Sequence, residues 1–251
     1  MALAHAAARV DNGGMSPQDG FSPGDGAPDN VPPSVRAQLL ATEHWSLLAS
    51  RSTTQGEVLT RISMFLTLTS ASLVSLALVG QATRFSDIFL LLAGVVLFTD
   101  LMVGLLTQVR VLNVAAEDIM YVLAMNRLRA AYVELDPGIA KFIMASPHDD
   151  QSGSVQTYYF LGRRSSWSHV AGSSMVFIHT VNSALIAILA GLLASVLGAG
   201  TGMAAAAAAA AGLAFLAGSS IHGYRSYASF WRDYRPVSPT PSDPATPSNA
   251  R

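Results

Sequence analysis

Four stretches of the chain consist almost wholly of apolar residues, with no polar face at helical spacing. They cover roughly residues 58–80, 87–108, 170–197 and 203–222. At 1.5 Å per helical residue each can cross a hydrocarbon layer of about 30 Å. A helix in the core of a soluble protein is rarely apolar all round over such a length. The pattern therefore predicts an all-α fold, an integral membrane four-helix bundle.

Short glycine-containing turns pair these helices into two transmembrane hairpins, residues 54–108 and 170–222. The first turn runs from Gly80 to Phe85, and the second contains Gly198, Gly200 and Gly202. The last helix holds eight consecutive alanines, Ala204 to Ala211. Alanine is barely apolar, so we expect its hairpin partner to carry this helix into the membrane; a helix lying on the membrane surface is the alternative.

The second apolar stretch continues into a long polar helix, because neither glycine nor proline interrupts the chain from Leu105 to Asp136. We call its cytoplasmic part the stalk. Apolar and small residues repeat along it at alternating spacings of four and three, the rhythm of a coiled coil. This predicted packing face consists of Leu112, Ala116, Ile119, Leu123, Asn126, Ala130 and Val133. It either covers neighbours in the same chain, such as a helix at 35–50, or mediates self-association with Asn126 setting the register.

The segments around the hairpins differ in composition. Residues 1–33, rich in Gly, Pro, Asp and Ser, are expected to be disordered. Ser34 is placed to cap a short helix over 34–53, lying on the membrane surface or on the cytoplasmic domain. Thr54 and Glu57 have capping-box spacing and would open the first transmembrane helix.

The cytoplasmic helical segment spans residues 109–169. Asp136-Pro137 ends the stalk and starts a short helix to about 145, a loop follows over 146–153, and residues 154–162 fit either a strand or a helix. After the second hairpin, residues 223–251 form an interfacial aromatic and basic segment and then a disordered tail from Pro236.

Composition supports lipid as the main solvent. Half the residues (51%) are hydrophobic and 12% are charged, against about 25% charged in a typical soluble domain. The net charge of −1 gives no indication of nucleic-acid binding. The absence of cysteine excludes disulfides, thiol catalysis and cysteine-ligated metals.

Basic residues predict the orientation. Of the 15, only Arg84 falls in a turn between paired helices, while the other 14 lie in the N-terminal, middle and C-terminal segments. Basic residues concentrate on the cytoplasmic side. We expect a multi-pass protein of the bacterial cell membrane, with both termini cytoplasmic and the lipid bilayer as its main partner.

One carboxylate interrupts the second apolar stretch. Asp100 lies eight residues from its inner end, and equal depth on the other helices predicts Thr67, His179 and Asn182 in the same layer. A buried charge is costly in lipid and needs a partner. The cluster is either a proton or cation site, with Asp100 and His179 exchanging charge, or a hydrogen-bonded clasp between helices.

Other motifs give weaker evidence for a functional site. His148, Asp149 and Asp150 have metal-ligand composition, but three adjacent side chains do not converge on one ion, so no metal or cofactor is expected. Arg127 and Arg129 could contact anionic lipid headgroups or a phosphate ligand, or form a solvated face. No H-E-x-x-H or G-x-S-x-G motif occurs.

Two stretches, residues 51–71 and 125–132, resemble motifs of uncharacterised bacterial multipass membrane proteins. The order of short helix, two membrane helices and long cytoplasmic helix is similar, over roughly the first 135 residues, to two-helix membrane effectors of bacterial defence systems. No function follows from either resemblance.

The sequence thus favours a non-enzymatic membrane scaffold or interaction protein that self-associates as a homo-oligomer. The alternative is a small channel or ion-translocating oligomer that uses Asp100 and the hydroxyl stripe Ser63, Thr67 and Ser70. A membrane-embedded enzyme is a third alternative.

Overall fold

The computed structural model describes residues 31–162 and 173–241, and in these ranges the chain is all-helical. Each of the four long helices is long and apolar enough to cross a membrane, as predicted. Residues 1–30, most of the segment expected to be disordered, lie outside the described ranges. The long helices are α1 (Pro33–Thr83), α2 (Asp87–Leu135), α5 (Ser174–Val196) and α6 (Thr201–Asp233).

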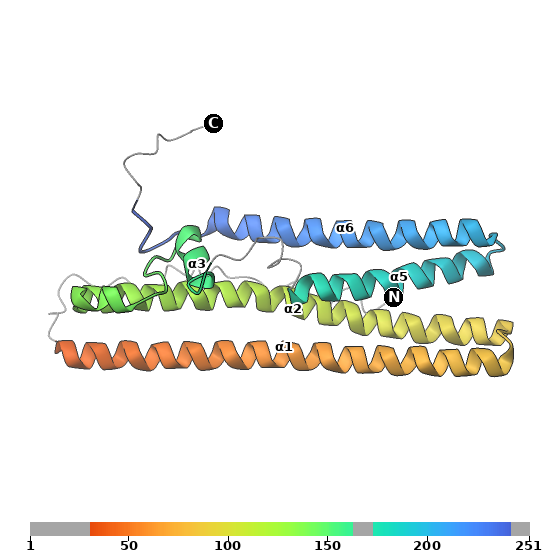
Figure 1. Ribbon diagram of the computed structural model, residues 1–251, viewed down its shortest axis with the longest axis horizontal. Coiled ribbons are helices and arrows are strands. Elements are labelled where there is room, and N and C mark those ends of the chain that lie inside the picture. Colours follow the sequence, from red (N-terminus) through yellow and green to blue (C-terminus); the bar gives the residue numbers. More distant parts are fainter. Residues whose placement is uncertain (1–30, 163–172, 242–251) are drawn as a thin grey trace, which may run out of the picture.

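The long helices lie in a row rather than in a closed bundle. Helix α1 packs on α2, α2 on α5 and α5 on α6, and Figure 1 shows α1 and α6 at the two edges of the row. The two hairpins are therefore joined mainly where α2 meets α5.

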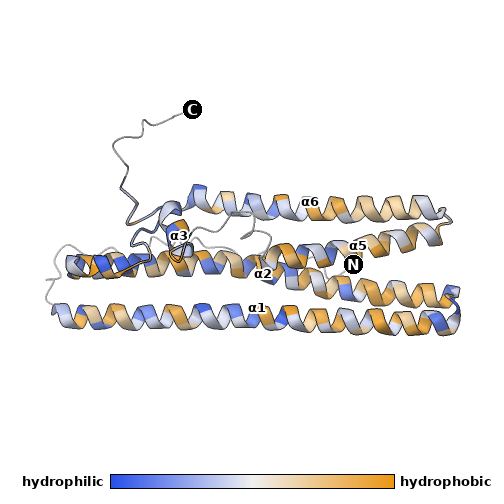
Figure 2. Ribbon diagram, viewed as in Figure 1, coloured by the Kyte–Doolittle hydropathy of each residue, from blue (hydrophilic) through white to orange (hydrophobic). Residues whose placement is uncertain are grey.

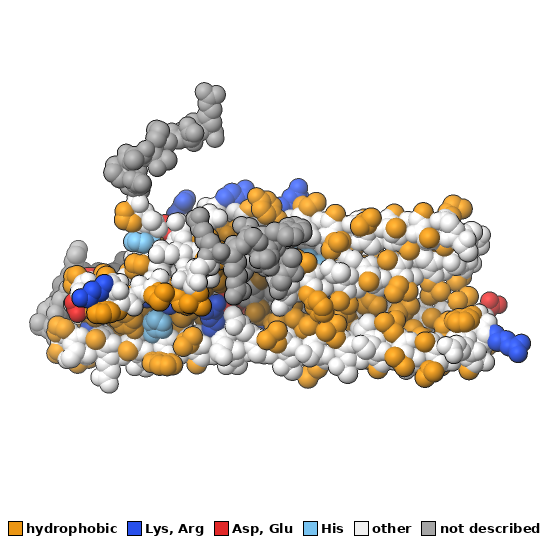
Figure 3. Space-filling model, in the orientation of Figure 1, with side chains coloured by type: hydrophobic (Ala, Val, Ile, Leu, Met, Phe, Trp, Pro, Cys, Tyr) orange, Lys and Arg blue, Asp and Glu red, His pale blue; other side chains and the backbone are white. Residues whose placement is uncertain are grey.

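Along its long axis the molecule consists of two parts, an apolar half at one end and a polar half at the other (Figure 2). The apolar half contains the turn between α1 and α2, all of α5 and the alanine run of α6. The polar half contains the beginning of α1, the stalk of α2, the short helices and the end of α6. In Figure 3, hydrophobic side chains cover one half, and charged side chains gather over the other half and at the far tip.

Helix α1 is continuous, so the separate helix over 34–53 was a wrong prediction. The capping box does not form: Glu57 instead accepts hydrogen bonds from Arg61 and Arg110. The N-cap is Pro32, and Ser34 lies inside the first turn. One buried or half-buried stripe at spacings of three and four runs along the helix and explains its continuity. The stripe consists of Leu40, His44, Leu47, Arg51, Thr54, Val58, Ile62, Phe65, Thr69, Ser72, Leu76 and Gly80.

The turn between α1 and α2 needs Gly80. Arg84 and Phe85 both adopt left-handed backbone angles, with φ of 51° and 56°. This folds the Phe85 ring back onto the helix, where a Cβ on residue 80 would lie 2.6 Å from a ring carbon. Only glycine leaves room for this packing.

Helix α2 carries the predicted stalk to Leu135, but its seam against α1 lies one residue before the predicted one. Asp118 bonds to Arg51, and the Tyr132 ring stacks on His44 with centroids 5.9 Å apart. One residue is a rotation of about 100° on a helix. The seam residues, buried or half-buried, are Val111, Asp118, Val122, Met125, Arg129 and Tyr132.

Part of the predicted packing face of the stalk is covered within the same chain, while Ala116 is exposed. Leu123 and Asn126 are buried. Leu112 and Ile119 are half-buried and line a groove of about 490 Å³ beside α6.

Small residues make the contact between α5 and α6. A Cβ on Gly191 would lie 3.2 Å from that of Ala208, and one on Gly212 would lie 3.0 Å from that of Ala187. Close backbone approach of this kind holds helices together in an apolar solvent. Helix α6 continues to Asp233, 11 residues beyond its predicted end at 222.

Two short helices follow the stalk. The first, η1 (Pro137–Phe142), is a 3₁₀ helix. The second, α3 (Gln151–Tyr158), settles the open choice over 154–162 in favour of a helix. The Asp150 side chain caps α3 by accepting a hydrogen bond from the Gly153 amide at 2.7 Å.

Candidate functional site

A group of buried and half-buried polar side chains, spread along the helix axes, joins α1, α2 and α5 inside the apolar half. We call it the polar layer, and it consists of Thr69, Ser72, Asp100, Gln108, His179 and Asn182. Asp100 is 1% exposed, and one of its carboxylate oxygens accepts a hydrogen bond from the Ser72 hydroxyl at 3.2 Å. Thr67 is not part of this layer. It is exposed, and its hydroxyl bonds to the backbone carbonyl of Ser63. Five residues separate Thr67 from Ser72, which places them on different faces of α1.

The tightest polar contact of the layer joins α2 to α5. The buried Asn182 amide donates to the Gln108 side-chain oxygen at 2.7 Å. Its own oxygen lies where a side chain on Gly104 would begin, 2.1 Å from a Cβ built there. Sequence reasoning missed Gln108, although it lies two helical turns beyond Asp100 on a neighbouring face.

His179 is buried but lies at another depth than Asp100. The two helices are antiparallel, and Asn182 sits level with the stretch between Gly104 and Gln108. Counting the helical rise from that level separates His179 and Asp100 by about 13 Å along the axis. Direct exchange of charge between them is therefore not supported by the geometry.

The layer is packed and still has unused hydrogen-bonding capacity. Within the described part of the chain, its buried atoms without a partner are Thr69 Oγ1, Asp100 Oδ2, His179 Nε2 and Asn182 Oδ1. The last three residues are at most 1% exposed. Both interpretations of the polar residues therefore stay open: the bonds from Ser72 and Asn182 fit a clasp between helices, and the unpartnered atoms fit a proton or cation site.

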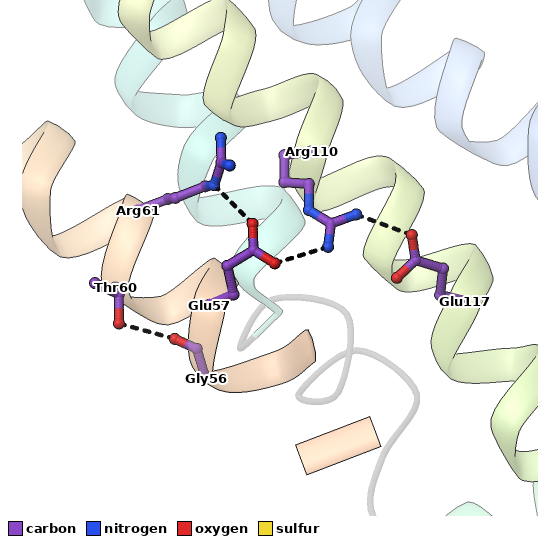
Figure 4. A network of polar contacts seen from close by, with 6 residues as sticks. All are labelled: Gly56, Glu57, Thr60, Arg61, Arg110 and Glu117. Carbon is purple, nitrogen blue, oxygen red and sulfur yellow. Dashed lines mark hydrogen bonds and ion pairs between the residues drawn. The ribbon is translucent and has the colours of Figure 1, made fainter. Parts of the chain in front are cut away.

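A chain of ion pairs marks the border between the two halves (Figure 4). Glu57 on α1 accepts from Arg61 at 3.0 Å and from Arg110 on α2 at 3.1 Å. Arg110 also reaches Glu117 at 2.9 Å. These partly exposed pairs contribute little stability individually. They mark the position along α1 and α2 at which the polar half starts.

Asp118 joins three elements in the polar half. It accepts two hydrogen bonds from Arg51 on α1 at 2.6 and 3.2 Å, one from Gln55, and one from the Tyr158 hydroxyl of α3 at 2.7 Å. Burial alone would raise the pKa of Asp118, but these donors outweigh it and lower the pKa. Burial and the same carboxylate raise the pKa of Tyr158.

Asp149 joins the stalk to the segment that directly follows α6. Its carboxylate accepts from Arg127 at 2.5 Å, from the Tyr234 hydroxyl at 3.0 Å, and from the backbone amides of Val237 and Ser238. Burial works against its charged form, yet the donors lower the pKa of Asp149. Burial raises the pKa of Tyr234 to about 12.

Asp150 holds the next part of the same segment. It accepts from the amide and the hydroxyl of Thr240 at 2.7 and 2.9 Å. Residues 236–241 were expected to be disordered and are instead held by these two aspartates. The His148-Asp149-Asp150 cluster is thus structural, and no group of metal-ligating side chains occurs in the ranges that the structure describes.

The two arginines proposed as anion contacts have different surroundings. Arg127 is neutralised by Asp149 and also contacts Tyr234. Arg129 donates to the side-chain oxygen of Asn126 at 2.6 Å. Asn126 accepts a second bond from Thr157 and donates to the His148 carbonyl, so it is used within the chain.

No protein family, curated protein sequence or solved structure matches this chain.

Proposed function

We propose that the chain is a non-enzymatic integral membrane scaffold that self-associates through α1. The apolar half supports the membrane assignment. From Asp87 at the tip to Arg110 at the ion-pair border, α2 rises about 34 Å, close to the hydrocarbon thickness of a bilayer. Asp118, Asp149 and Asp150 of the polar half accept hydrogen bonds from other parts of the same chain. This use of their carboxylates favours a structural role over a catalytic one.

The proposed orientation places the polar half in the cytoplasm of a bacterial cell, with both termini there. Helix α1 begins and α6 ends in the polar half (Figure 1), and this half holds most of the basic side chains. Reporter tags at both ends should therefore be inaccessible from outside intact cells, and a tag in the Arg84 turn should be accessible. A terminal tag exposed to the outside would contradict the orientation.

One observation carries the scaffold assignment: α1 has an exposed apolar face in the polar half. We call the side of α1 that carries Val35 and Leu39, four residues apart, the outer face of α1; Leu39 is 63% exposed, and Trp45, 71% exposed, lies about 120° further round the helix. Trp45 lies about 18 Å and Leu39 about 27 Å along the helix from Glu57. The headgroup zone is only about 5–8 Å deep, so lipid does not cover these side chains. Large apolar side chains exposed to water mark contacts between proteins.

A second copy of the chain is the partner that fits this face. The membrane keeps all copies parallel, and a two-fold axis along its normal places α1 beside α1 of the next copy. Helix α1 is at the edge of the row, so its outer face is open to such a neighbour. This moves the proposed contact from the stalk, where the sequence suggested it, to α1.

Cysteine crosslinking tests this contact, since the chain has no native cysteine. Ser46→Cys introduces a reporter on the outer face, and Gln156→Cys, exposed on α3, is the control. We expect oxidation in membranes to give dimers with Ser46→Cys and not with Gln156→Cys. Adding Leu39→Glu, one heptad before the reporter on the same side of the helix, should abolish the dimer. Failure of Ser46→Cys to crosslink, or crosslinking that persists with Leu39→Glu, would refute the proposal.

Ion translocation remains a second candidate, favoured by the unpartnered buried atoms of Asp100 and His179. The hydroxyl stripe Ser63, Thr67 and Ser70 is exposed on α1 away from the polar layer, so a pore lined by it would have to form between copies of the chain. If the candidate holds, protein in liposomes should conduct protons or cations, and Asp100→Asn should remove the flux. Liposomes with no flux above the lipid background would leave the scaffold alone.

A further inference from the structure

A pocket of about 500 Å³ in the polar half has one cationic and one apolar wall. Arg51 and Arg129 line the first wall, and Phe142, Met144 and Phe160 line the second. These apolar side chains are 75%, 65% and 45% exposed, respectively. The pocket lies between the α1–α2 seam and the segments η1 and α3.

The charges around the pocket do not balance. Arg51 is paired with Asp118, but Arg129 has no carboxylate within ion-pair distance among residues 31–162 and 173–241. Its neighbours are Arg51, which disfavours its charge, and the stacked rings of His44 and Tyr132. Burial lowers the pKa of Arg129, yet a guanidinium stays protonated at neutral pH. A half-buried cation without a counter-charge is costly.

The hydrogen bonds of Arg129 also leave it without enough partners. A guanidinium has five N–H donors in a planar fork. In the described part of the chain Arg129 donates one hydrogen bond, to Asn126. Phosphate and carboxylate oxygens match the remaining fork. The volume of the pocket is that of a small-molecule site, which typically combines an apolar lining with a few polar groups.

We propose that this pocket binds a small organic anion, a phosphate or carboxylate attached to an apolar or aromatic body. Arg129 receives the anionic group, and the body lies against Phe142, Met144 and Phe160. Lys141, whose ammonium lies 5.0 Å from the centre of the Phe142 ring, adds positive charge near the apolar wall.

The position of the pocket favours a soluble ligand over a lipid of the surrounding bilayer. Arg129 follows Arg110, at the ion-pair border, by 19 residues of continuous helix. That is about 28 Å along the axis, whereas the headgroup zone extends only about 5–8 Å. The proposal does not require self-association, because the outer face of α1 points away from α2 and the pocket.

Four probes separate the two parts of the proposed ligand: phenyl phosphate, benzoate, inorganic phosphate and benzyl alcohol. Binding to the full chain in phosphatidylcholine nanodiscs is measured by equilibrium dialysis. We expect saturable binding of phenyl phosphate or benzoate, and the tighter of the two identifies the anionic group. Inorganic phosphate and benzyl alcohol each lack one part and should bind at least about tenfold more weakly.

Variants assign the binding to the pocket. Arg129→Gln should weaken binding of the aromatic anion by about tenfold or more. The control Arg36→Gln removes an exposed arginine of α1 outside the pocket and should leave binding unchanged. Phe142→Ala should weaken the aromatic anions and leave inorganic phosphate unaffected.

A measurement on the unmodified chain covers the case in which Arg129→Gln does not fold. Phenylglyoxal labelling, read by mass spectrometry, should modify Arg129, and the bound aromatic anion should protect it. The proposal is overturned if no probe binds, if Arg129→Gln binds as tightly as the parent, or if Arg129 is not protected. It is also overturned if phosphatidylglycerol nanodiscs abolish probe binding at equal ionic strength, since the occupant is then a lipid headgroup.

Discussion

Gly104→Ala tests the junction that joins the two hairpins. The added methyl carbon would lie 2.1 Å from the Asn182 side-chain oxygen and 2.8 Å from a ring carbon of Phe65, so α5 and α1 would both have to move. Overpacking of this kind costs about 1–3 kcal/mol. Displacing Asn182 also removes its bond to Gln108, a further ~1 kcal/mol. We expect a total destabilisation of about 2–4 kcal/mol.

Gly94→Ala is a matched control on the same helix. A Cβ there meets only a Leu192 methyl carbon at 3.9 Å, an ordinary contact. Both substitutions gain the same helix propensity of up to about 1 kcal/mol, so their difference isolates the clash. Unfolding in detergent by added dodecyl sulfate, followed by near-ultraviolet circular dichroism, should give a lower midpoint for Gly104→Ala. Equal midpoints, or a higher one for Gly104→Ala, would refute the close packing of α2 against α5.

Three further predictions concern the polar half. Asp118→Asn should lower the free energy of unfolding by about 2–3 kcal/mol, measured by thermal unfolding in detergent; unchanged stability would show that the carboxylate contacts do not hold α1 and α3 in place. Because the pKa of Asp118 is lowered in the fold, its contribution should be present above the ordinary value of about 3.9 and be lost as the pH falls through the folded-state pKa; an acid transition that Asp118→Asn does not alter would contradict this. Asp150→Ala should speed hydrogen exchange at the amides of Gly153 and Thr240, which each donate to the Asp150 carboxylate at 2.7 Å. Unchanged exchange at Thr240 would mean that Asp150 does not hold the segment after α6.

The sequence predicts individual members of the polar layer better than their pairing. Asp100, His179 and Asn182 are all buried, as expected for polar residues in helices of this apolar composition. Their pairing depends on the axial register of α5 against α2, which places Asn182 beside Gln108 and His179 about 13 Å from Asp100. The prediction that Thr67 belongs to this layer was wrong for a similar reason. The depth of a residue along a helix does not give the rotation of that helix about its axis.

The polar half was the least predictable part. Asp118, Asp149 and Asp150 are ordinary acidic residues in sequence, and none stands in a motif that indicates its partners. Their donors come from residues 22 to 90 positions away, apart from local caps. The stalk shows the same limit, because two adjacent stripes of apolar residues differ by one position and only the presence of α1 selects between them.

By itself the sequence determined the elements: four membrane-length helices, a continuous stalk that ends at Asp136-Pro137, and tight turns at glycine. These follow from local properties, namely hydropathy, helix propensity and the missing amide hydrogen of proline. The tertiary structure alone decided which faces meet, that the helices form a row, and that Arg129 faces a pocket without a counter-charge. Those features depend on contacts between residues far apart in the chain, where a shift of one residue turns a helix by about 100° and exchanges every partner.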